Sequence, residues 1–551
     1  MKQPQNVIFW GAGATAALEI RQTDSQTKFI QRITGADELE ADEPDKPLPP
    51  VKERVVKALA PNGVEPWISA LSDLITILGD RNKNYESIDA INDEERDAMR
   101  RNWQVANDEE LKSRIISLRL IYDWPALKSV VRICPGSSKD TFKLNDLFNI
   151  LDMHSPLGFG VRAPTSFEGE GQFFDARRLI GAKNALRMLL GAAFYIDYQE
   201  CIRSKGNVLA QYRDFASSLG RRMQRQGIDI ARQCKLDKPE FYKGDVAFVS
   251  LNYDPIALWV QFIANRELNK SASVPHIGSP AVPLHIFHDF GHLIPARRIG
   301  KGDAHWPWYP MNEAVAQRLN EPTVSASRVR LIKFLFPHGC LCWRECPDCG
   351  KLSSYHGDDW KLDDPGLFLP PPLLSFDKRM CSERIKGMES TRRRNGAIDA
   401  RACLHCGTLT YAHHTQTVMQ SSFKSQPPSF IEEIQRDLRD VAMQAGHIIF
   451  MGYSLPPDDV TYRAFFSARC QRKVRPTDVR CTVVGLDGKY PDWCTPAELK
   501  NHHSPWPETM KAACDIFGEK NVRFYGGGVP NVFLDGGIVT DAALERLLNW
   551  P

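Results

Sequence analysis

The 551-residue chain lacks long apolar segments and has no excess of charge of either sign. No run approaches the roughly 18 consecutive apolar residues that a membrane-spanning helix needs, and no apolar core follows the first polar residues as it would in a secretory signal. Lysine and arginine total 70 against 67 aspartates and glutamates, for a net charge of +3. This balance gives no general reason to expect nucleic acid as a partner. We therefore expect a cytoplasmic globular protein.

The fourteen cysteines lack the regular spacing of a disulfide framework. Four of them form two C-x-x-C-G units, in which Cys346 is paired with Cys349 and Cys403 with Cys406. Each tight turn presents two sulfurs to one ion, so the pattern predicts a single zinc site with four thiolate ligands. Four thiolates leave no position for water, and such a zinc would be structural. Reduced structural or redox cysteines are the alternative interpretation.

Short apolar segments that end in glycine-rich or polar turns are the main fold signal of the sequence. Four such segments are present, at residues 6–10, 246–251, 447–451 and 481–486. The turns that follow them begin at Gly11, Asn252, Gly452 and Asp487. Buried apolar runs of this kind are typical of a parallel α/β sheet, in which ligands bind at the carboxyl ends of the strands. We therefore expect the turns to converge on one crevice.

A helical block separates the first apolar segment from the others. Apolar residues recur in it at helix spacing, at Trp67, Ile68, Leu71, Leu74, Ile75 and Leu78 and again at Leu111, Ile115, Leu118 and Tyr122. A further helix is predicted after the capping box of Ser429 and Glu432. The predicted organisation is a Rossmann-like α/β domain in three parts, at 1–35, 241–339 and 421–551, with a large helical insertion at 36–240 and a zinc-ribbon module at 340–420.

The first turn, Gly11-Ala12-Gly13-Ala-Thr15, follows a predicted strand and opens a predicted helix. Its glycines would let backbone amides approach a pyrophosphate, while the helix start would supply partial positive charge and Thr15 a hydroxyl. The turn lacks the third glycine of the usual dinucleotide fingerprint. By itself, a plain connection between strand and helix is the commoner interpretation.

Polar residues with catalytic potential lie in two further places. Asn252 and Asp254 follow a predicted strand, where they could bind ribose hydroxyls and position a water, or cap the next helix. His338 could act as a base near neutral pH, although a single histidine is usually structural. A second histidine cluster is an alternative source of the base: His285, His288 and His292. Only His338 is followed by a glycine and a cysteine pair.

The order of these motifs resembles that of the sirtuin-like NAD-binding family, in particular the bacterial sirtuin-like domains of anti-phage defence proteins. The family has a GAG turn, a T-x-N-x-D motif, a His-Gly pair, a zinc ribbon of four cysteines and a G-[ST]-S-[LP] turn. The counterparts here are GAGAT, LNYD, HGCLCW with CPDCG, CLHCG, and GYSLPPDD. The resemblance covers residues 6–21, 245–256, 334–350, 400–407 and 429–487.

The resemblance implies how NAD would be held. Gly11, Ala12 and Gly13 would contact the pyrophosphate. Gly452 and Ser454 would lie on the other side of the dinucleotide.

The resemblance also implies catalytic and structural roles. Asn252 and Asp254 would lie beside the nicotinamide ribose, and His338 would be the general base. Asp487, at a strand end, would accept a hydrogen bond from the adenosine ribose. The four paired cysteines would be the zinc ligands.

The sequence departs from the protein deacetylases of the family. These carry a G-I-P-D-F-R segment after the glycine turn, and residues 16–30 here contain no such segment. The helical block is also larger than a plain deacetylase needs. Both departures argue against a tunnel for an acyl-lysine peptide.

Together, the motifs predict a NAD hydrolase that cleaves the bond between nicotinamide and ribose, giving ADP-ribose and nicotinamide. The expected setting is bacterial antiviral defence by NAD depletion. Such an activity needs restraint, so we expect a homo-oligomer or a partner defence protein, with the helical block as a regulatory or assembly surface. The alternatives are a non-catalytic NAD or ADP-ribose sensor, a sirtuin-type deacylase or ADP-ribosyltransferase, and a zinc-stabilised nucleic-acid-binding protein.

Overall fold

The chain divides into two compact units. The sheet unit comprises Met1–Ile20, Cys201–Gly339 and Pro427–Pro551, and the helical unit comprises Arg21–Glu200 and Cys340–Gln426. Within them, the computed structural model describes residues 5–20, 23–36, 92–102, 106–162, 173–233, 243–272, 282–288, 330–345, 352–354, 429–456, 459–471, 479–500 and 506–550.

An eight-stranded sheet organises the sheet unit. Its order is β11 (Trp493–Cys494), β12 (Val522–Tyr525), β10 (Arg480–Val484), β9 (His447–Met451), β1 (Asn6–Trp10), β4 (Lys243–Ser250), β6 (Arg330–Leu335) and β5 (Leu284–His288). β11 runs antiparallel to β12, and the other seven strands are mutually parallel. The prediction of an α/β fold with a mainly parallel sheet is confirmed. The four predicted strands are the neighbours β10, β9, β1 and β4, whereas the sequence pattern does not reveal β5, β6 and β12.

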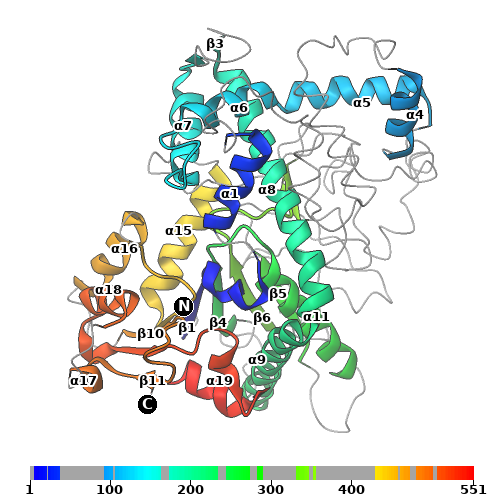
Figure 1. The fold of residues 1–551 in the computed structure, drawn as a ribbon. Helices are drawn as coiled ribbons and strands as arrows, with labels where there is room; N and C mark the ends of the chain where they lie inside the picture. The colour runs from blue at the N-terminus through cyan, green and yellow to red at the C-terminus, as the bar shows by residue number, and fades with distance from the viewer. Residues whose placement is uncertain are drawn as a thin grey trace. The chain divides into compact units, whose positions relative to one another are not determined.

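Both faces of the sheet are covered, which explains why its central strands are continuous apolar runs. Every residue of β1 and of β9 is buried. Neighbouring residues on a strand point to opposite faces. Phe9 packs edge-on against Phe466 of α16 (Val460–Gln471), with 5.2 Å between ring centroids. Trp10 packs edge-on against Tyr212 of α9 (Gly206–Arg232) at 5.9 Å, so α16 and α9 cover opposite faces (Figure 1).

The remaining helices of the sheet unit extend these two layers. They are α11 (Ile256–Ala272), α15 (Ser429–Gln444), α17 (Pro496–Leu499), α18 (Glu508–Phe517), α19 (Asp541–Leu548) and the 3-10 helices η1 (Ala12–Leu18), η6 (Glu519–Asn521) and η7 (Asn531–Phe533). A hairpin of β13 (Leu534–Asp535) and β14 (Ile538–Val539) precedes α19. α11 and α19 contact α9, whereas α15 and α18 contact α16. The predicted helix that leads into β9 is thus α15.

Helix α9 belongs to the sheet unit, although its sequence lies inside the predicted insertion at 36–240. It contacts α11, β5 and β6, and its Phe215 stacks on Phe533 at 4.4 Å between ring centroids. The unit boundary falls at Cys201, before α9 begins. Helical periodicity shows that a helix has an apolar face, but it does not show which core that face joins.

The helical unit is built around packed helices. They are α1 (Thr23–Thr34), α4 (Asp93–Asn102), α5 (Asp108–Ile121), α6 (Trp124–Ile133), α7 (Leu144–Leu157) and most of α8 (Ala176–Ser204). The unit also contains two short antiparallel strand pairs, β2 (Val161–Arg162) with β3 (Phe173–Phe174) and β7 (Trp343–Glu345) with β8 (Leu352–Ser354). α1 packs on α6 and α7, and Trp124, Leu147 and Leu186 are buried in one core.

The two predicted helices of the block have different outcomes. The pattern around Leu111 and Ile115 forms α5, in which both side chains are buried. The pattern at 67–78 lies outside the described residues.

Helix α8 is the one described helix that is long and apolar enough to cross a membrane by length and composition. Of its apolar window, 67% is buried inside the structure. This burial is that of a core helix in a packed protein.

Candidate functional site

The turns at the carboxyl ends of β9, β1, β4 and β6 carry most of the predicted site residues (Figure 1). Gly452 follows β9, Gly11 follows β1, Asn252 follows β4 and His338 follows β6. Because these strands are adjacent and parallel, the turns share one edge of the sheet. The turns at Gly11, Asn252 and Gly452 therefore lie on one edge, as expected, and the His-Gly turn lies there too. A common crevice stays a prediction.

The turns after β1 and β9 pack backbone against backbone. The amide of Gly11 donates to the carbonyl of Met451, and the amide of Gly13 donates to the carbonyl of Gly452, each at 2.9 Å. A Cβ atom on Gly11 would lie 2.6 Å from the Gly452 oxygen, and one on Gly452 would lie 1.9 Å from the Ala14 nitrogen. Gly452 also has a φ of +62°, which side-chain-bearing residues rarely adopt. Glycine is therefore required at both turns for close packing.

This packing occupies the backbone amides that the sequence analysis predicts to bind a pyrophosphate. The amides of Gly11 and Gly13 are engaged by the β9 turn, and the amide of Ala14 donates to the Gly11 carbonyl at 2.9 Å. Thr15 is buried, and its hydroxyl donates to the Ala12 carbonyl at 3.2 Å. Ala12 itself is exposed at the start of η1. A phosphate at this turn would therefore meet the start of η1 rather than the Gly11 and Gly13 amides.

Asn252 forms a hydrogen bond with the glycine turn, whereas Asp254 forms one with the start of a helix. The Asn252 side-chain amide donates to the Gly11 carbonyl at 3.2 Å, and the residue is half-buried. Asp254 is buried, and its Oδ1 accepts a hydrogen bond from the Ile256 amide at the start of α11, at 3.0 Å. Asn252 thus lies half-buried against the glycine turn, while Asp254 performs the capping role that was its alternative.

His338 lies on a turn that a glycine makes possible. Gly339 has a φ of +76°, and its amide donates to the Phe336 carbonyl at 2.9 Å. The His338 side chain is only 2% exposed. Its Nδ1 lies 3.4 Å from the Leu251 carbonyl, and its Nε2 lies 3.1 Å from the hydroxyl of Tyr462. The candidate base is therefore next to the Asn252 turn and is enclosed by protein.

Aromatic residues that the motifs do not single out lie beside His338. The ring centroid of Tyr253 is 6.5 Å away and that of Tyr462 is 5.8 Å away. Tyr453 packs edge-on against Tyr462, and its hydroxyl donates to Asp459 at 2.6 Å. Burial, with a smaller contribution from Asp459, raises the pKa of Tyr462 well above its usual value. The Tyr462 hydroxyl therefore keeps its proton at neutral pH and can donate it in a hydrogen bond.

The remaining predicted dinucleotide contacts differ in their surroundings. Ser454 is exposed, two residues beyond Gly452. Asp487 is half-buried after β10, where its amide donates to the Gly526 carbonyl at 2.8 Å and its Oδ1 accepts from the Lys489 amide at 2.9 Å. One Asp487 carboxylate oxygen is thus used in a local turn. Both residues remain on the strand-end side of the sheet, beside the β9 turn.

Two of the competing histidines lie on the strand next to β6. His285 and His288 lie on β5, the last strand of the sheet, with β6 between β5 and β4. In the strand register His288 pairs with Phe334 and His285 with Leu331. His292 lies outside the described residues. The residue that shares the turn region with Asn252 is His338.

The predicted zinc ligands Cys346, Cys349, Cys403 and Cys406 lie outside the described residues. The first pair falls, in sequence, between the antiparallel strands β7 and β8, whose register joins Glu345 to Leu352. Among the residues that the structure describes, no group of three or more histidine, cysteine or acidic side chains could hold a metal ion. The zinc site therefore stays a prediction.

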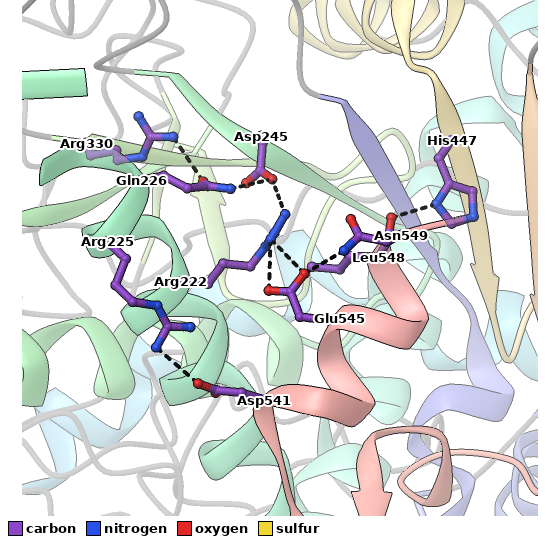
Figure 2. Close-up of polar contacts among 10 residues, drawn as sticks. All are labelled: Arg222, Arg225, Gln226, Asp245, Arg330, His447, Asp541, Glu545, Leu548 and Asn549. Atoms are coloured by element: carbon purple, nitrogen blue, oxygen red, sulfur yellow. Dashed lines mark hydrogen bonds and ion pairs between the residues drawn. The ribbon is translucent and has the colours of Figure 1, made fainter. Parts of the chain in front are cut away.

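A second polar region occupies the amino ends of the same strands, where α9 and α19 are held together by ion pairs. Figure 2 shows Arg222 of α9 between Asp245 of β4 and Glu545 of α19, at 2.9 and 3.3 Å. Nearby, Arg225 pairs with Asp541 at 3.0 Å, with both side chains about half exposed. These contacts attach the C-terminal helix to the sheet unit.

His447, at the start of β9, is the buried histidine of this region. Its Nδ1 lies 3.1 Å from the Leu548 carbonyl, as Figure 2 shows, and its Nε2 lies 2.7 Å from the Thr482 hydroxyl. Burial, with a contribution from nearby Arg523, lowers the pKa of His447 to about 3. His447 is therefore neutral at physiological pH and acts as a fixed link between the sheet and α19.

Comparison with known proteins adds no assignment to this geometry. No protein-family model matches the chain. No curated protein matches it either. The function is therefore argued from the site and the motifs that build it.

Proposed function

We propose that the protein is a sirtuin-like NAD hydrolase that cleaves the bond between nicotinamide and ribose and releases ADP-ribose and nicotinamide. One observation carries the proposal. The Gly452 turn contacts the Gly11 turn, Asn252 donates to the Gly11 carbonyl, and His338 lies against the carbonyl of Leu251, the residue before Asn252. Four of the motifs that resemble this family, those of Gly11, Asn252, His338 and Gly452, thus form one continuous chain of contacts at a strand-end edge, the usual ligand-binding edge of such sheets.

The chemistry that this arrangement supports is a displacement at the ribose carbon. The carbon–nitrogen bond breaks, its electron pair goes to the pyridinium nitrogen, and nicotinamide departs neutral while the ribose gains oxocarbenium character. Asn252 would orient the ribose and a water. The water oxygen bonds to the ribose carbon, and its proton passes to His338. Enclosure by protein strengthens such preorganised polar contacts, because they act in a water-poor environment.

The rest of the dinucleotide would extend along the same edge. The start of η1 at Ala12 would face the pyrophosphate, and Ser454 and Asp487 would bind further along, toward β10. A zinc ion on the paired cysteines of the helical unit would be structural. The antiparallel strands on either side of Cys346 and Cys349 are consistent with a ribbon at that place.

The biological setting that we propose is bacterial antiviral defence in the cytoplasm. A hydrolase that empties the NAD pool would harm its own cell, so its activity must be restrained until infection. We infer that self-assembly or a partner defence protein provides this control, and that the helical unit supplies the surface for it.

A second candidate function is a non-catalytic sensor of NAD or ADP-ribose. His338 is only 2% exposed and both of its ring nitrogens have partners, while Asp254 is used as a helix cap. A site with those features could bind a nucleotide without hydrolysing it. The sensor and the hydrolase differ in one property, which is consumption of NAD.

Product analysis with a matched pair of asparagine variants tests the proposal. Purified protein is mixed with NAD over a range of protein concentrations, and nicotinamide and ADP-ribose are separated by chromatography. Asn252→Ala is expected to lose NAD cleavage. Asn549→Ala, at an exposed asparagine beyond α19, removes a side-chain amide at the opposite end of the strands and is expected to keep it. Equal activity of the two variants, or no products from the wild type at any concentration, would reject the hydrolase.

A further inference from the structure

His338 is held from two sides by groups of different chemistry. On one side is the Leu251 carbonyl, 3.4 Å from Nδ1, which is long for a hydrogen bond. On the other side is the Tyr462 hydroxyl, 3.1 Å from Nε2. A carbonyl oxygen can only accept a hydrogen bond, whereas a hydroxyl can donate or accept. The carbonyl therefore favours a proton on Nδ1.

A neutral imidazole has one donor nitrogen and one acceptor nitrogen. With the proton on Nδ1, Nε2 carries the lone pair, and the Tyr462 hydroxyl is the donor that matches it. Nε2 is then the nitrogen that could take a proton during a reaction, once the Tyr462 O–H rotates away and frees the nitrogen's one lone pair. The opposite tautomer would place the ring N–H toward the tyrosine hydroxyl. It would also place the lone pair of Nδ1 against the lone pairs of the Leu251 carbonyl oxygen, and these repel each other.

Tyr462 is well fixed for this task. It lies in the first turn of α16, directly after the Gly452 turn, and only 5% of it is exposed. Tyr453 packs edge-on against it at 6.4 Å between ring centroids. The hydroxyl keeps its proton at neutral pH, as shown above, so it is always available as a donor. The helix that follows the predicted dinucleotide turn thus also reaches the predicted base.

We infer that Tyr462 is a positioning residue for His338: its hydroxyl donates to Nε2 and holds the ring with Nδ1 protonated toward the Leu251 carbonyl. The link to catalysis rests on the proposed NAD hydrolase function. In that reaction, loss of the hydroxyl would let the ring turn and change tautomer, so that Nε2 would often carry a proton and could not accept one. Loss of the group that fixes a histidine's tautomer typically lowers activity on the order of tenfold or more.

The tautomer can be measured without NAD. Solid-state ¹⁵N NMR of wild-type protein with labelled histidine rings, assigned with His338→Gln, reports which ring nitrogen carries the proton. We expect His338 to be protonated on Nδ1. A proton on Nε2 in the neutral ring would overturn the inference; the tautomer is read from the wild-type protein, and the variant serves only to assign the signal.

The contact can be broken with Tyr462→Phe and followed by histidine modification. Diethyl pyrocarbonate reacts with unprotonated ring nitrogens, and mass spectrometry gives the rate for each histidine. We expect His338 to react severalfold faster in Tyr462→Phe than in the wild type, while buried His447 stays unreactive in both and reports an intact fold. Tyr490→Phe is the matched control, since the Tyr490 hydroxyl is buried without a hydrogen-bond partner among the described residues. It should leave the His338 rate unchanged.

Kinetics separate positioning from mere packing. In Tyr462→Phe, kcat for NAD cleavage should fall on the order of tenfold or more with little change in KM, because substrate contacts are untouched. An unchanged His338 modification rate in this variant, or an unchanged kcat, would overturn the inference. If the expected tautomer and modification rates are found but the wild type consumes no NAD, the hydrolase proposal fails while the Tyr462–His338 pair stands.

Discussion

The two ends of the central sheet hold two buried histidines with similar hydrogen-bond partners and different surroundings. His338 at the carboxyl ends and His447 at the amino ends each have a carbonyl near Nδ1 and a hydroxyl near Nε2. Nδ1 of His447 also lies 3.0 Å from the side-chain oxygen of Asn6. His447 is part of a strand and is flanked by arginines, which with burial keep it neutral. His338 is on a turn beside Asn252 and the glycine loops. Hydrogen bonds alone therefore do not distinguish a structural histidine from a candidate base; its place in the sheet does.

The largest expected effect is at the carboxyl end. His338→Ala should reduce NAD cleavage on the order of a hundredfold to ten-thousandfold, as loss of a positioned base does. The fold and the zinc content should be retained, while the melting temperature should fall because His338 is buried and both of its ring nitrogens have partners. Chromatography of nicotinamide release, beside melting curves, measures both properties. His288→Ala, on the edge strand β5, is the control and should cleave NAD normally; the reverse pattern would mean that the base is misassigned.

Zinc removal should act on stability and not directly on the chemical step. The double variant Cys346→Ser with Cys403→Ser is expected to lose its single zinc ion, with a loss of several kcal/mol of stability, because four thiolates bind a structural ion tightly. Metal analysis and thermal unfolding test this. Cys494→Ser, at a half-buried cysteine outside the pairs, should keep the zinc. Wild-type protein without zinc would remove the predicted site altogether.

At the amino end, His447 should make the fold sensitive to acid. Its pKa is about 3 in the folded protein against an ordinary value of 6.5, so the unfolded chain binds a proton that the folded chain excludes. The stability is fully present above pH 6.5 and is lost as the pH falls from there toward 3, at up to about 1.4 kcal/mol per pH unit. His447→Gln cannot be protonated, so its urea-unfolding free energy should fall less between pH 7 and pH 5. An unchanged pH slope would show that His447 is not the group responsible.

The smallest effects separate two arginines of the same helix. Arg222 has a side chain that is 12% exposed and pairs with Asp245 and Glu545, so Arg222→Ala should cost about 2 kcal/mol by leaving the partly buried Asp245 carboxylate without its charged partner. Arg225 pairs with Asp541 at the surface, and Arg225→Ala should cost at most about 1 kcal/mol. Chemical denaturation of both variants measures the difference. Equal costs would mean that burial does not set the strength of the contacts between α9 and α19.

Two strands without charged residues could be predicted from the sequence, whereas two strands that contain charged residues could not. β1 and β9 are uninterrupted apolar runs and are readily predicted. β6 and β12 contain Lys333 and Arg523, which a local pattern assigns to the surface. In the structure Lys333 pairs with Asp437 of α15, and Arg523 donates to the Thr482 hydroxyl and to carbonyls near the end of α19. The partners that let these charges lie inside are distant in sequence.

The candidate site shows the same limit. The turns at Gly11, Asn252 and Gly452 are visible because each directly follows an apolar strand. Tyr462 is not visible, since it lies 124 residues from His338 in sequence and belongs to no motif. The amide contacts between the Gly11 and Gly452 turns are equally hidden, because they depend on β1 and β9 being neighbours.

We propose that the carboxyl-end site hydrolyses NAD and does not only bind it. The most direct test is a time course of nicotinamide released per protein chain, with NAD in large excess over protein and His338→Ala run in parallel. We expect many nicotinamides per wild-type chain, with equal amounts of ADP-ribose, and little release by the variant. Tight binding of NAD by the wild type with no nicotinamide released would reject the hydrolase and favour the nucleotide sensor.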